Sequence, residues 1–146
     1  MRALLTCLMR RSGCGILALA LSVASCAAMA DVVAVVSAKS TVTALTSSQV
    51  TDIFLGKTSH FPNGLLAEPI DQVDGSAARD RFYAKLAGKN AAQIKAYWSK
   101  IIFTGRGQPP PAVKNSVEVK KRLALNPAAI GYIEHDLVDD SVRVIL

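Results

Sequence analysis

Short apolar runs alternate with amphipathic segments from residue 32 to the end of the chain. The continuous β-branched run at 32–36 predicts a strand that is buried on both faces. Three shorter runs predict further strands, at 68–71, 130–133 and 142–146. Pro69 places the strand at 68–71 at a sheet edge, or marks the start of that strand.

Between these runs, apolar residues recur with the period of an α-helix. This spacing predicts helices over 47–55, 76–86, 91–103 and from 116 to about 126. The helix at 91–103 has the clearest core stripe, formed by Ile94, Tyr97, Trp98, Ile101 and Ile102. Strands that alternate with helices predict an α/β domain with a mostly parallel sheet flanked by helices.

The first 30 residues have a different pattern. They contain three arginines and no acid, then an apolar run at 15–24, and end in Ala28-Met29-Ala30. This order is typical of a secretory signal peptide, with cleavage after Ala30. Val23-Ala24-Ser25-Cys26 offers an alternative, in which Cys26 is lipidated and anchors the protein to a membrane. We therefore expect a periplasmic or secreted protein, whose mature part, 31–146, has no transmembrane segment.

Removal of the predicted signal peptide leaves 116 residues, enough for one modest domain, and lowers the net charge from +6 to +3. All three cysteines lie in the removed part, which excludes a disulfide framework and a cysteine nucleophile. Neither histidine belongs to an HxxxH or HExxH pair, and there is no G-x-S-x-G elbow or P-loop. We expect no enzymatic activity, no metal or other cofactor, and no nucleic-acid partner.

Gly75 and Ser76 stand just before the helix predicted at 76–86, and Arg79 lies one turn inside it. One interpretation is structural: Ser76 is an N-cap and Asp74 neutralises Arg79. The other is an anion site, because the first N–H groups of a helix are free and favour negative charge. In that site Gly75 allows close approach, Ser76 and the N–H of Ala77 donate hydrogen bonds, and Arg79 reaches back to the ligand.

A second polar cluster follows the first predicted strand. Ser37 and Lys39 come at its carboxyl end, where open α/β sheets bind ligands. If this strand lies beside 68–71, Ser37 and Lys39 face the same crevice as Gly75 and Ser76. The alternative is an ordinary Ser-rich turn.

Four motifs in order suggest a family. They are Asp52–Lys57 (DIFLGK), Asp74-Gly75-Ser76 ahead of Phe82, the Tyr97-Trp98 helix, and Asn126–Ile133 (NPAAIGYI). Over most of 32–146 the chain resembles the phosphate-binding proteins of phosphate ABC transporters, and more closely the short PBP-like domain proteins. In that family a Gly-Ser-Gly-Thr turn and a preceding arginine grip phosphate. Here Ser76 matches the serine, Ala77 and Ala78 replace Gly and Thr, and residues 71–74 contain no arginine.

The resemblance implies a single-lobe, type II periplasmic-binding-protein-like domain, because the full receptors have two lobes and about twice this length. It also implies a ligand, inorganic phosphate or a similar oxyanion, and a link to phosphate uptake or sensing through an ABC transporter permease. The site residues would be Ser37, Lys39, Gly75, Ser76, Ala77 and Arg79. The alternative function is an accessory module of the envelope that binds a partner protein and no ligand, with the Pro-rich loop at 105–111 as its surface.

Overall fold

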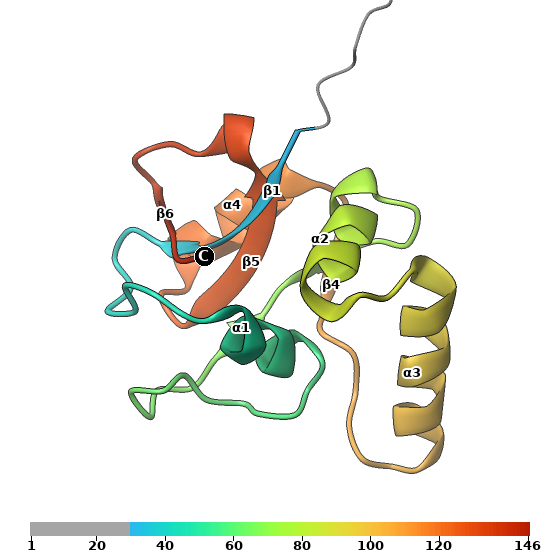
Figure 1. The fold of residues 1–146 in the computed structure, drawn as a ribbon. Helices are drawn as coiled ribbons and strands as arrows, with labels where there is room; N and C mark the ends of the chain where they lie inside the picture. The colour runs from blue at the N-terminus through green and yellow to red at the C-terminus, as the bar shows by residue number, and fades with distance from the viewer. Residues whose placement is uncertain (1–29) are drawn as a thin grey trace, which may run out of the picture.

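The computed structural model describes residues 30–146 (Figure 1). The predicted signal peptide up to residue 29, with Cys26, lies outside the described residues. The elements follow in the order β1 (Val32–Ser37), α1 (Ser47–Phe54), β2 (Glu68–Pro69), β3 (Asp71–Gln72), α2 (Ala77–Ala87), α3 (Ala91–Phe103), β4 (Ala112–Val113), α4 (Ser116–Leu125), β5 (Ala129–Glu134), a short 3-10 helix (His135–Leu137) and β6 (Val142–Val144). None of the helices in this part of the chain is long and apolar enough to span a membrane.

The main sheet has the strand order β2-β5-β1-β6. β1 pairs antiparallel with β5, so that Val32 lies opposite Glu134 and Val36 opposite Ile130. It also pairs antiparallel with β6, whereas β2 is parallel to β5. The expected α/β class with flanking helices is confirmed, but the expectation of a mostly parallel sheet is wrong. Alternating strands and helices favour parallel neighbours only when consecutive strands pair, and β1 pairs with the last two strands of the chain instead.

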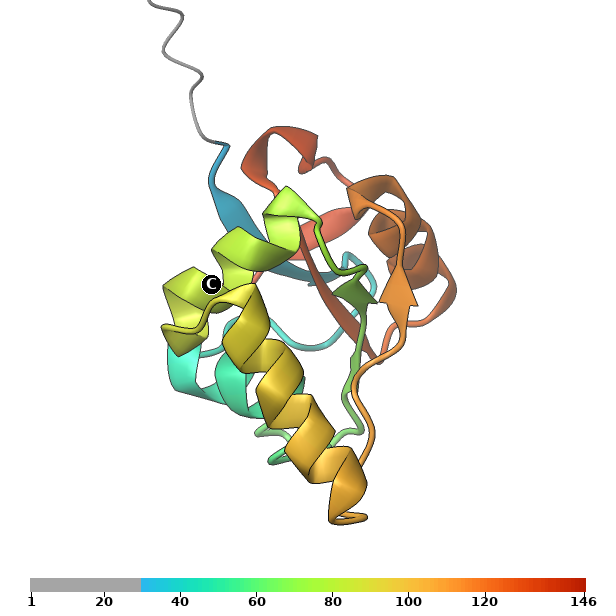
Figure 2. The ribbon, with the colours of Figure 1, turned by 90° about the vertical axis from the view of Figure 1, so that its right-hand side faces the viewer.

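β3 and β4 form a second, two-stranded parallel ladder. The single strand predicted at 68–71 is thus divided: Glu68 and Pro69 pair with β5, and Asp71 and Gln72 pair with β4. Figure 2 shows these two short strands side by side, with α3 running beside them. The Asp71 N–H donates to the Pro111 carbonyl at 2.9 Å, which attaches the Pro-rich segment to β3.

The core occupies both faces of the main sheet, because alternate β1 side chains point to opposite sides. Val32, Ala34 and Val36 belong to the larger cluster, which α1, α2 and α3 cover with aromatic and aliphatic side chains. Val33 and Val35 belong to the smaller cluster, which α4 covers. Figure 1 shows α1 and α2 on one side of the sheet and α4 on the other. The predicted two-faced burial of β1 is confirmed.

The start of α1 is fixed by the residue before it. The N-cap of α1 is Thr46, whose side chain accepts from the Gln49 N–H while the Gln49 side chain accepts from the Thr46 N–H. This reciprocal pair is a capping box, and it fixes the start of α1 at Ser47, the first residue of the predicted range. In the predicted core stripe of α3, Ile94 and Trp98 are buried and Tyr97 and Ile101 are half-buried, whereas Ile102 is exposed.

Candidate functional site

The turn before α2 has the geometry of a capped helix start. Gly75 has a φ of 85°, a backbone conformation that side chains disfavour. The Ser76 hydroxyl oxygen accepts the Arg79 N–H at 3.4 Å, and the Ser76 carbonyl accepts the Asp80 N–H at 3.1 Å. The predicted N-cap is therefore present at Ser76.

The Ser76 hydroxyl also has an acceptor within the protein. It donates to Oε1 of Gln72 at 2.9 Å. The Gln72 amide nitrogen in turn donates to Ser116 Oγ and to the Tyr132 carbonyl oxygen. Gln72 is buried, and the sequence analysis gave it no role. The local signal was a pair of polar residues, Asp71 and Gln72, between Ile70 and Val73, and polar residues are usually hydrogen-bonded when buried.

A buried carboxylate holds Arg79 from the opposite side. Asp71 accepts from Arg79 Nε at 3.3 Å, from the Tyr83 hydroxyl at 3.0 Å, and from the Tyr132 hydroxyl. Burial raises the pKa of Tyr83 and of Tyr132 far above the usual range, and the Asp71 charge raises both further. The Arg79 guanidinium also lies over the Tyr83 ring, 5.3 Å from its centroid. These contacts fix the arginine in position.

A second acid, Asp74, forms an ion pair with the outer edge of the guanidinium. Nη1 of Arg79 lies 2.6 Å from Oδ1 of Asp74, whose side chain is 72% exposed. Burial lowers the pKa of Arg79, but the charges of Asp71 and Asp74 outweigh this effect and raise it. Arg79 is thus charged and faces two carboxylates, of which the structural interpretation of this stretch expected Asp74 and not Asp71.

Some donors at the start of α2 remain free. The Arg79 and Asp80 N–H groups are bonded to Ser76, but within residues 30–146 the N–H groups of Ala77 and Ala78 donate to no acceptor. Beside this turn lies a cavity of about 350 Å³ between α2, α3 and the Pro-rich segment. Asp74 and Arg79 line it, together with Lys95 of α3, a cation that the sequence analysis did not assign to the site. This groove offers the cations of Arg79 and Lys95 to an anion, and the free amides of α2 lie in the turn beside it, outside its lining.

Ser37 and Lys39 lie elsewhere. On β1, Val36 lies opposite Ile130, the second residue of β5. Ser37 is the next residue of β1, so it is level with the start of β5. Gln72, four residues before Ser76, contacts Tyr132, toward the other end of β5. The expectation of a shared crevice is wrong, because β5 lies between β1 and β2, and the carboxyl end of β1 is level with the start of β5.

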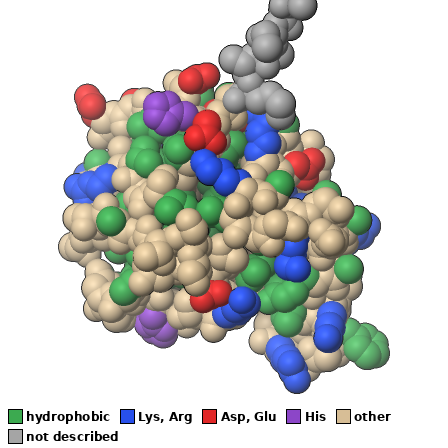
Figure 3. All heavy atoms as spheres, in the orientation of Figure 1, with side chains coloured by type: hydrophobic (Ala, Val, Ile, Leu, Met, Phe, Trp, Pro, Cys, Tyr) green, Lys and Arg blue, Asp and Glu red, His purple; other side chains and the backbone are tan. Residues whose placement is uncertain are grey.

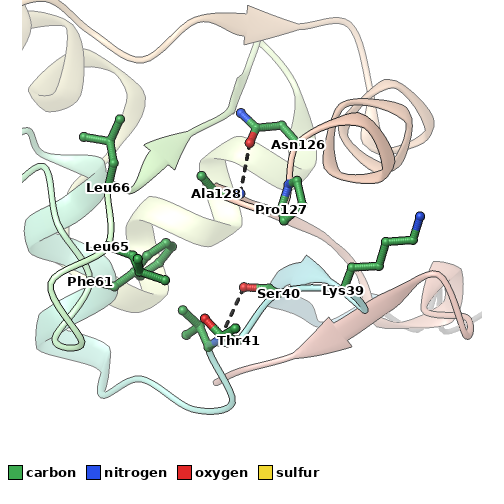
Figure 4. Close-up of a pocket in the computed structure, with 10 residues that line it drawn as sticks. Lys39, Ser40, Thr41, Phe61, Leu65, Leu66, Asn126, Pro127 and Ala128 are labelled. Carbon is green, nitrogen blue, oxygen red and sulfur yellow. Dashed lines mark hydrogen bonds between the residues drawn. The ribbon is translucent and has the colours of Figure 1, made fainter.

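Lys39 lines a separate cavity of about 410 Å³, shown in Figure 4. Its other walls come from Ser40 and Thr41, from the loop with Phe61, Leu65 and Leu66, and from residues 126–128. Ser40 and Asn126 oxygens there accept N–H groups of Val42 and Ala128. In the view of Figure 4, the Lys39 side chain lies on the far side from Phe61 and Leu65. The lining is mainly apolar, which is not the chemistry of an oxyanion site.

Solved structures with the same fold exist. A protein from Clostridium perfringens, described as a phosphate ABC transporter substrate-binding protein and solved with bound phosphate, matches 79% of this chain at a TM-score of 0.61 and 24% identity. An ABC-type phosphate transport receptor from Vibrio cholerae matches 79% of this chain at a TM-score of 0.61 and 20% identity. PstS from Borrelia burgdorferi also matches 79% of this chain, at a TM-score of 0.59 and 16% identity.

The resemblance found in the sequence is thus confirmed at the level of the fold. The matches cover 44%, 45% and 46% of these three proteins, so the chain spans less than half the length of each. No protein-family model matches the chain, and no curated protein matches it. The phosphate and transport functions in the names above belong to those proteins.

Proposed function

We propose that this chain is a solute-binding-type protein, without enzymatic activity, that binds a small oxyanion, inorganic phosphate first, at the start of α2. The observation that carries the proposal is the free N–H group of Ala77, an exposed residue that follows the Gly75 turn and stands two residues before Arg79. A helix N-terminus with free amides attracts anions through both its donors and its dipole. The fold shared with proteins named for phosphate transport supports phosphate as the ligand.

In the proposed complex the anion displaces Asp74 from Arg79. The Asp74 side chain is exposed, so it can turn into water at small cost, because exposed ion pairs contribute about 1 kcal/mol or less. The guanidinium then pairs with the ligand while Asp71 holds its other edge. Gly75, Ser76, Ala77 and Arg79 form this site. Ser37 and Lys39 are not part of it.

The proposal extends to the setting of the protein. Residues 1–30 act as a signal peptide, residues 31–146 work in the periplasm, and the bound anion is passed to, or sensed with, an ABC transporter permease. The described part contains no membrane-spanning helix, which agrees with this setting.

A second function is favoured by a specific observation. The Ser76 hydroxyl already donates to Gln72, and Arg79 already faces two carboxylates. Because the groups that would bind the anion are already bonded within the protein, the chain could keep the fold and act as an accessory module that binds a partner protein and no ligand.

Phosphate titration followed by amide NMR separates the two functions. The protein is expressed from the full chain, and inorganic phosphate is added up to tens of millimolar. Oxyanion binding is expected to shift the amide signals of Gly75, Ala77 and Ala78 and to leave those of Ser37 and Lys39 in place. If no signal near α2 moves, the accessory function is supported instead.

The variant test uses two N-caps. Ser76→Ala is expected to weaken phosphate binding by about tenfold to a hundredfold, because hydrogen bonds to charged groups contribute about 1.5–3 kcal/mol. Thr46→Ala is the matched control: it removes the N-cap of α1, so it costs similar stability without touching the site. Equal weakening by both variants would mean that Ser76 acts only through stability.

A further inference from the structure

Basic charge is concentrated in one continuous part of the chain. Between Asp80 and Glu118 the sequence has no acid, but it contains Arg81, Lys85, Lys89, Lys95, Lys100, Arg106 and Lys114. The other residues from 31 to 146 contain seven Lys and Arg together with all eleven acids. The modest net charge of the domain therefore hides a strongly cationic segment built around α3.

α3 presents an unusual outer face. Its buried side, with Ile94 and Trp98, packs on the core. The opposite side, at helical spacing, carries Ala92, Ala96, Ser99 and Phe103, all exposed. The Phe103 side chain is 93% exposed, and the neighbouring Ile102 is also exposed. An aromatic ring so placed contributes nothing to the core of this domain.

Three cations surround that face. Lys95 and Lys100 flank it on α3, and Arg106 follows in the next loop; all three are exposed. Within residues 30–146 none of them forms an ion pair. Figure 3 shows basic side chains and a hydrophobic one together at the lower right, over the end of α3. Figure 1 shows this helix at the margin of the domain.

We propose that the outer face of α3, made of Ala92, Lys95, Ala96, Ser99, Lys100, Phe103 and Arg106, binds an anionic phospholipid surface. Small residues let the helix lie close to the headgroups, the lysines and Arg106 meet lipid phosphates, and Phe103 enters the acyl boundary. The geometry favours a lipid layer over a protein groove, because Phe103 projects outward and lines none of the cavities described above. A single exposed aromatic is also too few for a stacking platform, which disfavours single-stranded nucleic acid.

Helix-dipole stabilisation explains only part of this arrangement. A cation in the last turn, such as Lys100, is favourable at a helix C-terminus. That effect does not account for the exposure of Phe103, nor for Lys95, which stands a turn and a half earlier and also lines the groove beside α2. Attraction to an anionic surface accounts for all of them together.

Co-sedimentation with lipid vesicles tests the proposal. The protein expressed from the full chain is mixed with vesicles of phosphatidylcholine alone or with one-third phosphatidylglycerol. We expect binding to the anionic vesicles, much weaker binding to the neutral ones, and loss of the difference at 0.5 M salt. Equal binding to both vesicle types would overturn the proposal.

Variants identify the face. Lys95→Ala and Lys100→Ala are each expected to weaken binding about fivefold, and Phe103→Ala severalfold. The matched control is Leu125→Ala, which removes an apolar side chain that is 84% exposed at the end of α4, where Lys121 is paired with Glu118. This variant should bind like the wild type. Wild-type binding by Phe103→Ala, or binding to a short DNA oligonucleotide as tight as to vesicles, would refute the lipid assignment.

Discussion

Asp71 Oδ2 accepts a hydrogen bond from Arg79 Nε at 3.3 Å, and both side chains are more than nine-tenths buried. This contact explains why an arginine occupies the place where a capping glutamate would stabilise α2. Its positive charge opposes the helix dipole, but it is matched from inside the protein by an acid of β3. The arginine thus joins the helix to the strand, and the same residue presents its outer edge to the groove.

Loss of this acid should be costly. Asp71→Asn keeps the shape of the side chain but leaves the Arg79 charge with only the exposed Asp74. Breaking a buried pair costs about 3–5 kcal/mol, so we expect a fall of that size in the free energy of unfolding, measured in urea. Glu118→Gln breaks an exposed pair with Lys121 and should change the midpoint little. If the two variants unfold alike, Asp71 and Arg79 are not a stabilising pair.

Two tyrosines should make stability depend on alkaline pH. The pKa values of Tyr83 and Tyr132 are raised in the folded protein, whereas in the unfolded chain both are about 10. Above that pH the unfolded state loses these protons and the folded state keeps them. The free energy of unfolding should therefore fall with rising pH, by about 1.4 kcal/mol per pH unit for each tyrosine.

Urea unfolding between pH 8 and 11 measures this slope. In Tyr83→Phe the free energy of unfolding should fall less steeply above pH 10, by about 1.4 kcal/mol per pH unit, because one of the two tyrosines is gone. An unchanged slope would show that the hydroxyl ionises equally in both states.

Asp74 should compete with the bound oxyanion. Asp74→Asn frees the outer edge of Arg79, so phosphate no longer has to displace a carboxylate. Because exposed pairs are worth about 1 kcal/mol or less, affinity should rise up to about fivefold, as measured by calorimetry. Asp52→Asn breaks an exposed pair with Lys57 in the loop after α1 and serves as the control. Equal affinities for wild type and Asp74→Asn would remove Arg79 from the site.

Gly131 should not tolerate a side chain. A Cβ at this position of β5 would overlap Cγ1 of Val119 on α4. Overpacking of this kind costs about 1–3 kcal/mol, so Gly131→Ala should lower the thermal midpoint. In Gly107→Ala the added methyl meets Ile101 at an ordinary 3.6 Å, and the midpoint should hardly move.

Val119→Ala provides the second arm of this test. Combined with Gly131→Ala, it should cost less than the sum of the two single changes, because it removes the overlapping methyl. If the losses of stability in the two single variants simply add up in the double variant, the methyl of Val119 does not clash with the new Cβ at residue 131.

Local features of this fold were predictable from sequence, and long-range pairing was not. The start and end of α2, with Ser76 as N-cap and Gly88 in the left-handed conformation, follow from the residues present there. The partners of β1 do not, because its apolar run fits parallel or antiparallel neighbours equally well. That ambiguity placed Lys39 and Ser76 in one crevice, although they lie toward opposite ends of the sheet.

Buried polar residues were the other gap. Gln72 and Asp71 look like ordinary strand residues in sequence, and their meaning depends on Ser116, Tyr132 and Tyr83, which come later in the chain. The donor and acceptor types were visible, but their pairing is a property of the assembled fold. The candidate site was therefore predicted with Arg79 and its outer acid, Asp74, and without Asp71, which holds the arginine from inside the protein.

The position of β1 has a consequence for how the protein is made. It is the first element of the described chain, and both of its partners in the sheet, β5 and β6, come after α4. A ribosome delivers these segments in order, so β1 stays without its ladder until the last part of the chain has emerged. A transcript cut short before residue 129 should therefore yield a degraded polypeptide and not a smaller domain.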